Sequence, residues 1–101
     1  MDDAVKQQIV NNLREVYDPE ISLNVYDLGL IYDIEISNTQ CNITMSLTSA
    51  FCPMADQIVA DVESAGMQAD GIEKCDIKIT FDPQWGPEMI SEDGKLLLGI
   101  F

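Results

Sequence analysis

The chain has 101 residues, of which 18 are Asp or Glu and 5 are Lys or Arg, so its formal net charge at pH 7 is −13. Nucleic acids and anionic membrane surfaces both bind proteins through basic side chains, so this composition argues against either partner. Hydrophobic residues make up 47% of the chain, which predicts one folded domain over residues 1–101.

The N-terminal part is expected to form a helix and then a connecting segment. Apolar residues recur at helical spacing over residues 2–17, behind an acidic cap. Pro19 disfavours helical geometry in the residue before it, so the helix should end near residue 17. In the connecting segment, residues 18–29, Gly29 is expected to adopt a backbone conformation that a side chain would hinder.

Two alternating stretches separated by a polar turn predict a β-hairpin. Residues 30–37 form the first strand, residues 37–40 the turn, and residues 41–47 the second strand. One face of each strand is expected to be buried and the other polar. The apolar faces are Tyr32, Ile34 and Ile36 in the first strand and Cys41, Ile43, Met45 and Leu47 in the second, and the polar face of the second strand is Asn42, Thr44 and Ser46.

A second helix and a third strand follow. The helix is expected over residues 53–65, with Gly66 at the position just past its end, where glycine is common. The strand is expected over residues 75–82, with Cys75 and Phe81 on its buried face.

The C-terminal part is expected to break regular structure and then close with a short helix. Trp85 is interpreted as an anchor on the core, Ser91 as the helix cap and Gly99 as its end. The resulting fold class is α+β. We expect a two-layer sandwich whose small mixed sheet, a β-hairpin plus a third strand after a crossover helix, has helices packed on one face.

The stretch 47–54 joins a predicted strand to a predicted helix and holds Cys52 directly before Pro53. Pro is favoured in the first turn of a helix, so Cys52 is expected at the N-cap. Free backbone N–H groups and the helix dipole favour a thiolate there, and a thiolate is both a nucleophile and a soft-metal ligand. The alternative is that Cys52 is a small buried hydrophobic residue, as Cys41 and Cys75 are expected to be from their strand parity.

The inventory of residues limits the available chemistry. The chain has no histidine, so a cysteine nucleophile would lack its usual base, and no phosphate-binding loop is present. The three cysteines form neither a disulfide framework nor a Cys-x-x-Cys pair, and no signal or membrane-spanning pattern is visible, so we expect a cytoplasmic protein. One reactive thiolate cannot complete a four-cysteine cluster site. A cluster would need Cys52 from two copies, carboxylate ligands or a partner's cysteines.

Five stretches stand in a fixed order along the chain. They are Asp18-Pro19-Glu20, the run from Asp27 to Tyr32, Leu47-Thr48-Ser49 followed by Cys52-Pro53, Asp82-Pro83 with Trp85, and Met89 with Ser91-Glu92-Asp93-Gly94 and Leu98-Gly99. Together they resemble the SufT/PaaD-like iron–sulfur cluster assembly domain family over nearly the whole chain. The stand-alone SufT-like type is the nearest match, because the chain shows neither a P-loop ATPase module nor a cysteine-rich C-terminal extension. At Phe51 the chain departs from the family, which often has Gly there.

The resemblance implies a non-enzymatic accessory factor in iron–sulfur cluster assembly or transfer. It implies that Cys52 is the metal or cluster ligand or the reactive thiol, and that the cargo is a transient iron–sulfur cluster or iron. The implied partners are assembly proteins and client apo-proteins, and the shortage of ligands motivates the hypothesis of a homodimer paired through Cys52. Second-tier site candidates are Asp18, Glu20, Asp27, Thr48 and Ser49.

Two alternatives stay open at this point. The protein can be a non-catalytic adaptor that docks assembly machinery and clients without binding metal itself. The second-tier residues can be purely structural: Asp18 and Asp27 as acceptors of turn hydrogen bonds, and Thr48 and Ser49 as groups that satisfy the start of a helix.

Overall fold

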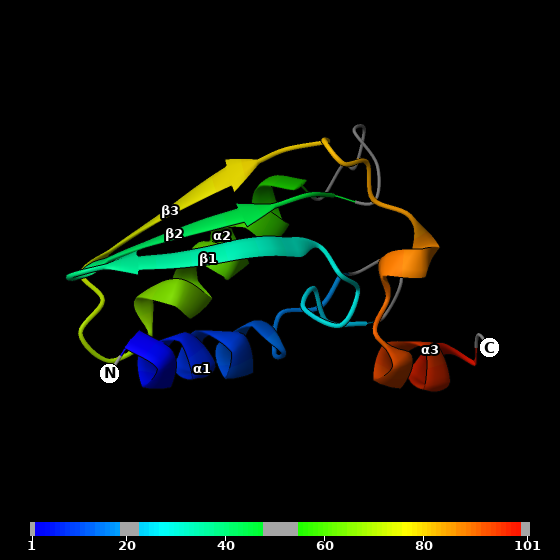
Figure 1. Cartoon of the computed structure of the whole chain (residues 1–101), viewed down its shortest axis with the longest axis horizontal. Coiled ribbons are helices and arrows are strands. Elements are labelled where there is room, and N and C mark those ends of the chain that lie inside the picture. The colour runs from blue at the N-terminus through cyan, green and yellow to red at the C-terminus, as the bar shows by residue number, and fades with distance from the viewer. Residues whose placement is uncertain (1, 19–22, 48–54, 100–101) are drawn as a thin grey trace.

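A computed structural model of the protein describes residues 2–18, 23–47 and 55–99 (Figure 1). The elements in chain order are α1 (Asp2–Leu13), β1 (Ile31–Ser37), β2 (Gln40–Met45), α2 (Ala55–Met67), β3 (Lys74–Ile79), a single 3₁₀ turn (Pro87–Met89) and α3 (Glu92–Leu98).

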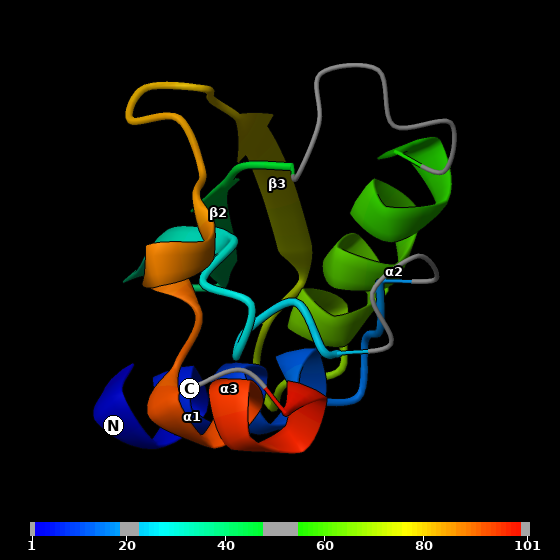
Figure 2. The same ribbon diagram turned by 90° about the vertical axis from the view of Figure 1, so that its right-hand side faces the viewer.

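The three strands form one mixed sheet in the order β1-β2-β3. β1 and β2 pair antiparallel as a hairpin, whereas β2 and β3 pair parallel, with α2 between them in sequence. α1 and α2 lie on the same side of the sheet, where α2 packs on β3 and α1 contacts both β1 and α2 (Figures 1 and 2). The predicted α+β fold, with its mixed sheet and one-sided helix layer, is confirmed.

The hairpin turn follows the prediction. Ser37 pairs with Gln40, which leaves two residues in the turn, and Asn38 has a φ of 56°. Asparagine tolerates this left-handed conformation better than most residues, so it suits a tight hairpin turn.

β2 shows the predicted alternation and lies at the centre of the core. All four of its predicted inward residues are buried, together with apolar residues of both long helices. Those are Cys41, Ile43, Met45 and Leu47 from β2 and the chain after it, Ile9 and Leu13 from α1, and Ile58 and Val62 from α2.

Two predicted orientations are wrong, and both lie just past the end of a strand. Ser46 was expected on the polar face, but it is fully buried and its N–H donates to the Leu30 carbonyl at 2.8 Å. Phe81 was expected in the core, but it is 43% exposed. β2 ends at Met45 and β3 at Ile79, so the two-residue alternation of a strand no longer governs these positions.

The sequence predicted that Gly66 lies just past the end of α2. The helix instead continues to Met67, and Gly66 is buried within it. A Cβ atom at Gly66 would lie 2.5 Å from the Sγ atom of Cys75. A Cβ atom at that distance would force the thiol or the helix to shift, so the glycine lets α2 approach β3 closely.

α1 ends at Leu13, earlier than the predicted residue 17. The chain then tightens into short-range turns and reaches Tyr17, which pairs with Asn24 in an isolated β-bridge. The Val25 N–H also donates to the Val16 carbonyl at 2.8 Å. These extended pairings compete with helix continuation, which explains the earlier end.

Candidate functional site

The structure describes two of the predicted site residues, Asp18 and Asp27. Glu20, Thr48, Ser49 and Cys52 lie outside the described residues, as does Pro53, at which the second helix was predicted to begin.

Asp18 stands at the base of the segment that connects α1 to the sheet. Its residue is only 1% exposed, and its backbone N–H donates to the Leu23 carbonyl at 3.0 Å. Together with the neighbouring bridge between Tyr17 and Asn24, this bond holds Asp18 beside Leu23. The fold therefore fixes Asp18 inside the protein, next to the stretch that contains Glu20.

Asp27 uses both carboxylate oxygens inside the fold. Oδ2 accepts a hydrogen bond from Asn24 Nδ2 at 2.8 Å, and Oδ1 accepts one from Ser91 Oγ at 3.0 Å. Its backbone N–H donates to Asn24 Oδ1, and its carbonyl accepts from the Ser91 N–H, both at 2.8 Å. These bonds support the structural alternative for Asp27: it joins a turn near the sheet to the start of the last helix.

Ser91 is the N-cap of α3, as predicted, because its Oγ accepts from the Gly94 N–H at 3.0 Å. Its second role, as donor to Asp27, was not predicted from the sequence. Asn24, three residues before Asp27, carries the local signal of an Asx turn that could have identified one of the two partners.

Residues 83–94, which we call the C-terminal brace, pack across residues 24–32. Trp85 Nε1 donates to the Leu28 carbonyl at 2.7 Å, and Tyr32 Oη donates to the Pro83 carbonyl at 2.8 Å. Gly29 has a φ of 81°, and a Cβ atom there would collide with the carbonyl group of Met89. The predictions for Trp85 as an anchor and for Gly29 as a backbone requirement are both confirmed.

Cys41 and Cys75 are register partners on the parallel strands β2 and β3, and both are buried free thiols, as their parity predicted. Their side chains hydrogen-bond to each other. This hydrogen bond, together with burial, raises the pKa of Cys75, so that thiol stays protonated at neutral pH. Because both thiols are buried, neither is open to a metal ion from the solvent while the sheet is intact.

Within residues 2–18, 23–47 and 55–99, no three His, Cys, Asp or Glu side chains are grouped so that they could hold a metal ion. A ligand set for iron or a cluster would therefore have to include residues outside these ranges or groups from another molecule. In the same ranges, no helix has the length and apolar character needed to cross a bilayer.

Comparisons with known proteins point to one family. Residues 6–79 match the family model described as iron-sulfur cluster assembly protein. The chain is 44% identical over 95 residues to a protein of Porphyromonas gingivalis named Fe-S protein maturation auxiliary factor, covering 93% of this chain and 90% of that one. It is also 35% identical over 72 residues to an iron-sulfur cluster carrier protein of Synechocystis, which covers 71% of this chain but only 20% of the carrier.

A solved structure supports the same relationship. The structure of a domain of unknown function, DUF59, from Bacillus anthracis superposes with a TM-score of 0.89 at 35% sequence identity. The match covers 98% of this chain and 95% of that one.

Proposed function

The chain belongs to the iron–sulfur cluster assembly protein family, and from this premise we propose that it is an accessory factor in the assembly of iron–sulfur clusters or their transfer to client proteins. The observation that carries the proposal is the 44% identity, over most of both chains, to a protein named as a maturation auxiliary factor. The cargo would be a transient iron–sulfur cluster, in keeping with the more distant relative named as a cluster carrier. The protein would act without catalytic turnover of its own.

Cys52 is the sulfur that we assign to the cluster or its iron. Support comes from the family resemblance around Cys52-Pro53 and from the fate of the other two cysteines. Cys41 and Cys75 are buried against each other in the core, so they cannot serve as ligands without unfolding part of the sheet. One thiolate leaves cluster ligation incomplete, which suits brief holding and hand-over to a partner that supplies the remaining ligands.

The partners would be assembly proteins and client apo-proteins. A cytoplasmic setting fits the two free thiols, because thiols stay reduced there.

One observation favours a second candidate function, the adaptor that binds no metal. Asp27, a predicted ligand candidate, already uses both carboxylate oxygens in hydrogen bonds. As an adaptor, the protein would bring an assembly protein and a client together through its surface alone.

Anaerobic reconstitution with iron and sulfide separates the two functions. We expect the wild-type protein to bind iron and sulfide with visible cluster absorbance, and Cys52→Ser to lose both. Cys41→Ala is the matched control, because it removes a thiol from the core and should keep the cluster if the protein folds. Equal loading of wild type and Cys52→Ser would contradict the ligand assignment.

A client-activation assay with the same variants tests the role itself. If Cys52→Ser still speeds activation of an apo-protein by a cluster donor, the adaptor function is favoured. If neither wild type nor Cys52→Ser affects client activation, the accessory role is wrong.

A further inference from the structure

β3 is an edge strand with an unpaired outer side among the strands that the structure describes. In Figure 1 it is the outermost strand of the sheet, with α2 behind it. On its inner side, the Lys74 N–H donates to the Thr39 carbonyl and the Thr80 N–H to the Met45 carbonyl. Successive residues of a strand direct their backbone groups to opposite edges, so those of Cys75, Ile77 and Ile79 point outward.

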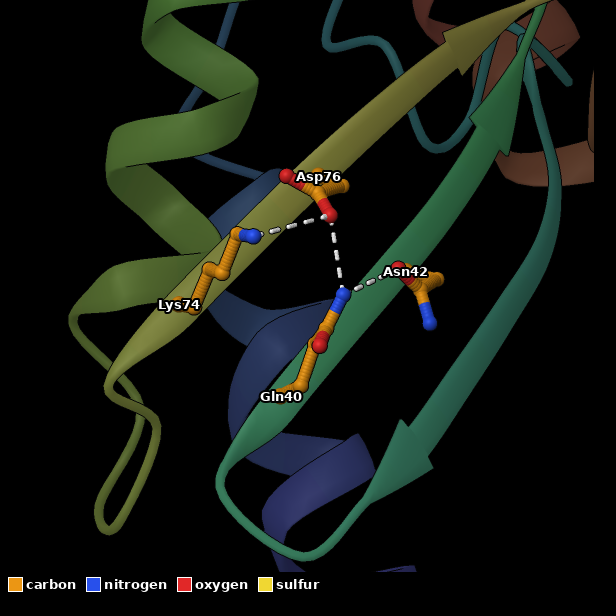
Figure 3. Close-up of polar contacts among 4 residues, drawn as sticks. All are labelled: Gln40, Asn42, Lys74 and Asp76. Carbon is orange, nitrogen blue, oxygen red and sulfur yellow. Dashed lines mark hydrogen bonds and ion pairs between the residues drawn. The ribbon is translucent and has the colours of Figure 1, made fainter.

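The side chains of the other three residues of β3, Lys74, Asp76 and Lys78, lie on the face of the sheet opposite α2. Figure 3 shows Asp76 beside Gln40 and Asn42 of β2 on this face. Gln40 Nε2 donates to Asp76 Oδ2 at 2.8 Å and to Asn42 Oδ1 at 3.0 Å, and Lys74 Nζ lies 3.9 Å from Asp76 Oδ2. The other oxygen of Asp76, Oδ1, makes none of these contacts.

Lys78 lies two residues further along the same face. Its side chain is exposed, and it forms no ion pair with any residue in the described ranges. β3 therefore presents a carboxylate and an ammonium group two positions apart, with the outward-facing backbone of Ile77 between them.

The charge of the two sheet edges differs in sign. β3 contains Lys74, Lys78 and Asp76, a net charge of +1, within a chain of net charge −13. β1, at the other edge, contains Asp33 and Glu35 and no basic residue, a net charge of −2. Of the two sheet edges, β3 is therefore the one at which two copies of this acidic chain would repel each other less.

We propose that two copies of this chain pair edge to edge through β3, antiparallel, about a two-fold axis at Ile77. In this register Ile77 faces the partner's Ile77, and their outward backbone groups exchange two hydrogen bonds. Asp76 then faces the partner's Lys78, and Lys78 faces the partner's Asp76. The same patch is complementary to itself, as a two-fold interface requires, and the two sheets become one.

Neighbouring registers fit less well. An axis at Asp76 would place Asp76 opposite the partner's Asp76 and Lys74 opposite the partner's Lys78, so like charges would face each other. An axis at Cys75 overlaps fewer residues, because β3 begins at Lys74. The partly exposed side chains of Ile77 and Ile79 also gain cover from a neighbouring strand in the proposed register.

This pairing stands apart from the proposed function. Because β2 runs parallel to β3, the axis at Ile77 sends the ends of the two β2 strands to opposite ends of the dimer. Its contacts come from β3 alone, so it is a different dimer from one paired through Cys52.

Charge exchange tests the pairing on the full chain. We expect sedimentation velocity over micromolar to millimolar protein to show a monomer–dimer equilibrium. Lys78→Glu alone and Asp76→Lys alone should each raise the dissociation constant about tenfold or more, because two attractive pairs become repulsive. An equimolar mixture of these two variants should form a heterodimer, since both of its cross-strand pairs again join opposite charges.

Lys6→Glu is the matched control, because it makes the same charge change on an exposed residue of α1 and should leave the dimer intact. Amide hydrogen exchange reads the backbone directly: Cys75, Ile77 and Ile79 should become protected as protein concentration rises. A wild-type chain that stays monomeric, a dimer that Lys78→Glu leaves unchanged, or a mixture without heterodimer would overturn the proposal. Protection of these amides only after addition of another protein would assign the edge to that protein.

Discussion

Two regions of the molecule contain side chains of types that could bind metal, and the fold occupies these side chains in two different ways. At the C-terminal brace, the Asp27 carboxylate is satisfied by polar partners, Asn24 and Ser91. Between β2 and β3, Cys41 and Cys75 are enclosed by the core and hydrogen-bond to each other. In both regions the candidate ligand is already used by the fold. Reactive residue types alone therefore do not mark a site, and Cys52 is the one cysteine that these two regions leave over.

The largest effect should come from Gly29→Ala, at the place where the brace packs on residues 24–32. The substitution forces a side chain into a left-handed backbone conformation and against the carbonyl group of Met89. We expect a loss of about 3 kcal/mol in the free energy of unfolding, from strain and overpacking together. Urea denaturation followed by circular dichroism measures it.

Gly71→Ala is the matched control for that variant. Gly71 has a similar φ of 82°, but a Cβ atom there would meet nothing within 4 Å. Gly71→Ala should therefore lower the free energy of unfolding only by the backbone strain, about 1 kcal/mol. Equal losses for the two variants would show that the brace does not press on Gly29.

The thiol region should respond to Gly66→Ala with a smaller loss, about 1–3 kcal/mol, because the new methyl group overpacks the contact with Cys75 Sγ. Combining it with Cys75→Ala removes the obstructing sulfur. The double variant should therefore be more stable than the sum of the two single losses predicts. Strict additivity in denaturation experiments would mean that α2 and β3 do not meet at this point.

The smallest effect should come from Asp27→Ala, at about 1–2 kcal/mol, since it removes hydrogen bonds in a half-buried turn. Ser91→Ala should be coupled to it in a double-mutant cycle. If Asp27 is structural, iron content per folded molecule after reconstitution stays at the wild-type level. Loss of iron without loss of stability would instead identify Asp27 as a ligand, whereas the buried thiols Cys41 and Cys75 would remain purely structural.

Local signals were sufficient for much of the fold. Alternation in β2, the turn at Asn38, the Ser91 cap and the Gly99 end are each determined by a few neighbouring residues, and each was predicted. Gly66 was misread, because a glycine near a helix end can terminate the helix or admit a close neighbour. Only the position of Cys75 on another strand distinguishes the two roles.

The site was predictable in part for the same reason. The structural alternative for Asp27 followed from its local sequence, and Asn24 lies within reach of that reasoning. Ser91 could not be identified in this way, since it lies 64 residues from Asp27 in the sequence and reaches it only through the packing of the brace. Likewise, strand parity predicted that Cys41 and Cys75 are buried, but only the register between β2 and β3 makes them partners.

The brace also bears on where this fold should be cut. The family match ends at Ile79, whereas the groups that bond Leu28, Asp27 and Tyr32 come from residues 83–91. A fragment trimmed at residue 79 would leave the Leu28 carbonyl without its hydrogen bond from the Trp85 indole. It would also leave the Asp27 carboxylate without its hydrogen bond from the Ser91 hydroxyl. A minimal version of this protein for expression or fusion therefore has to retain the segment through α3.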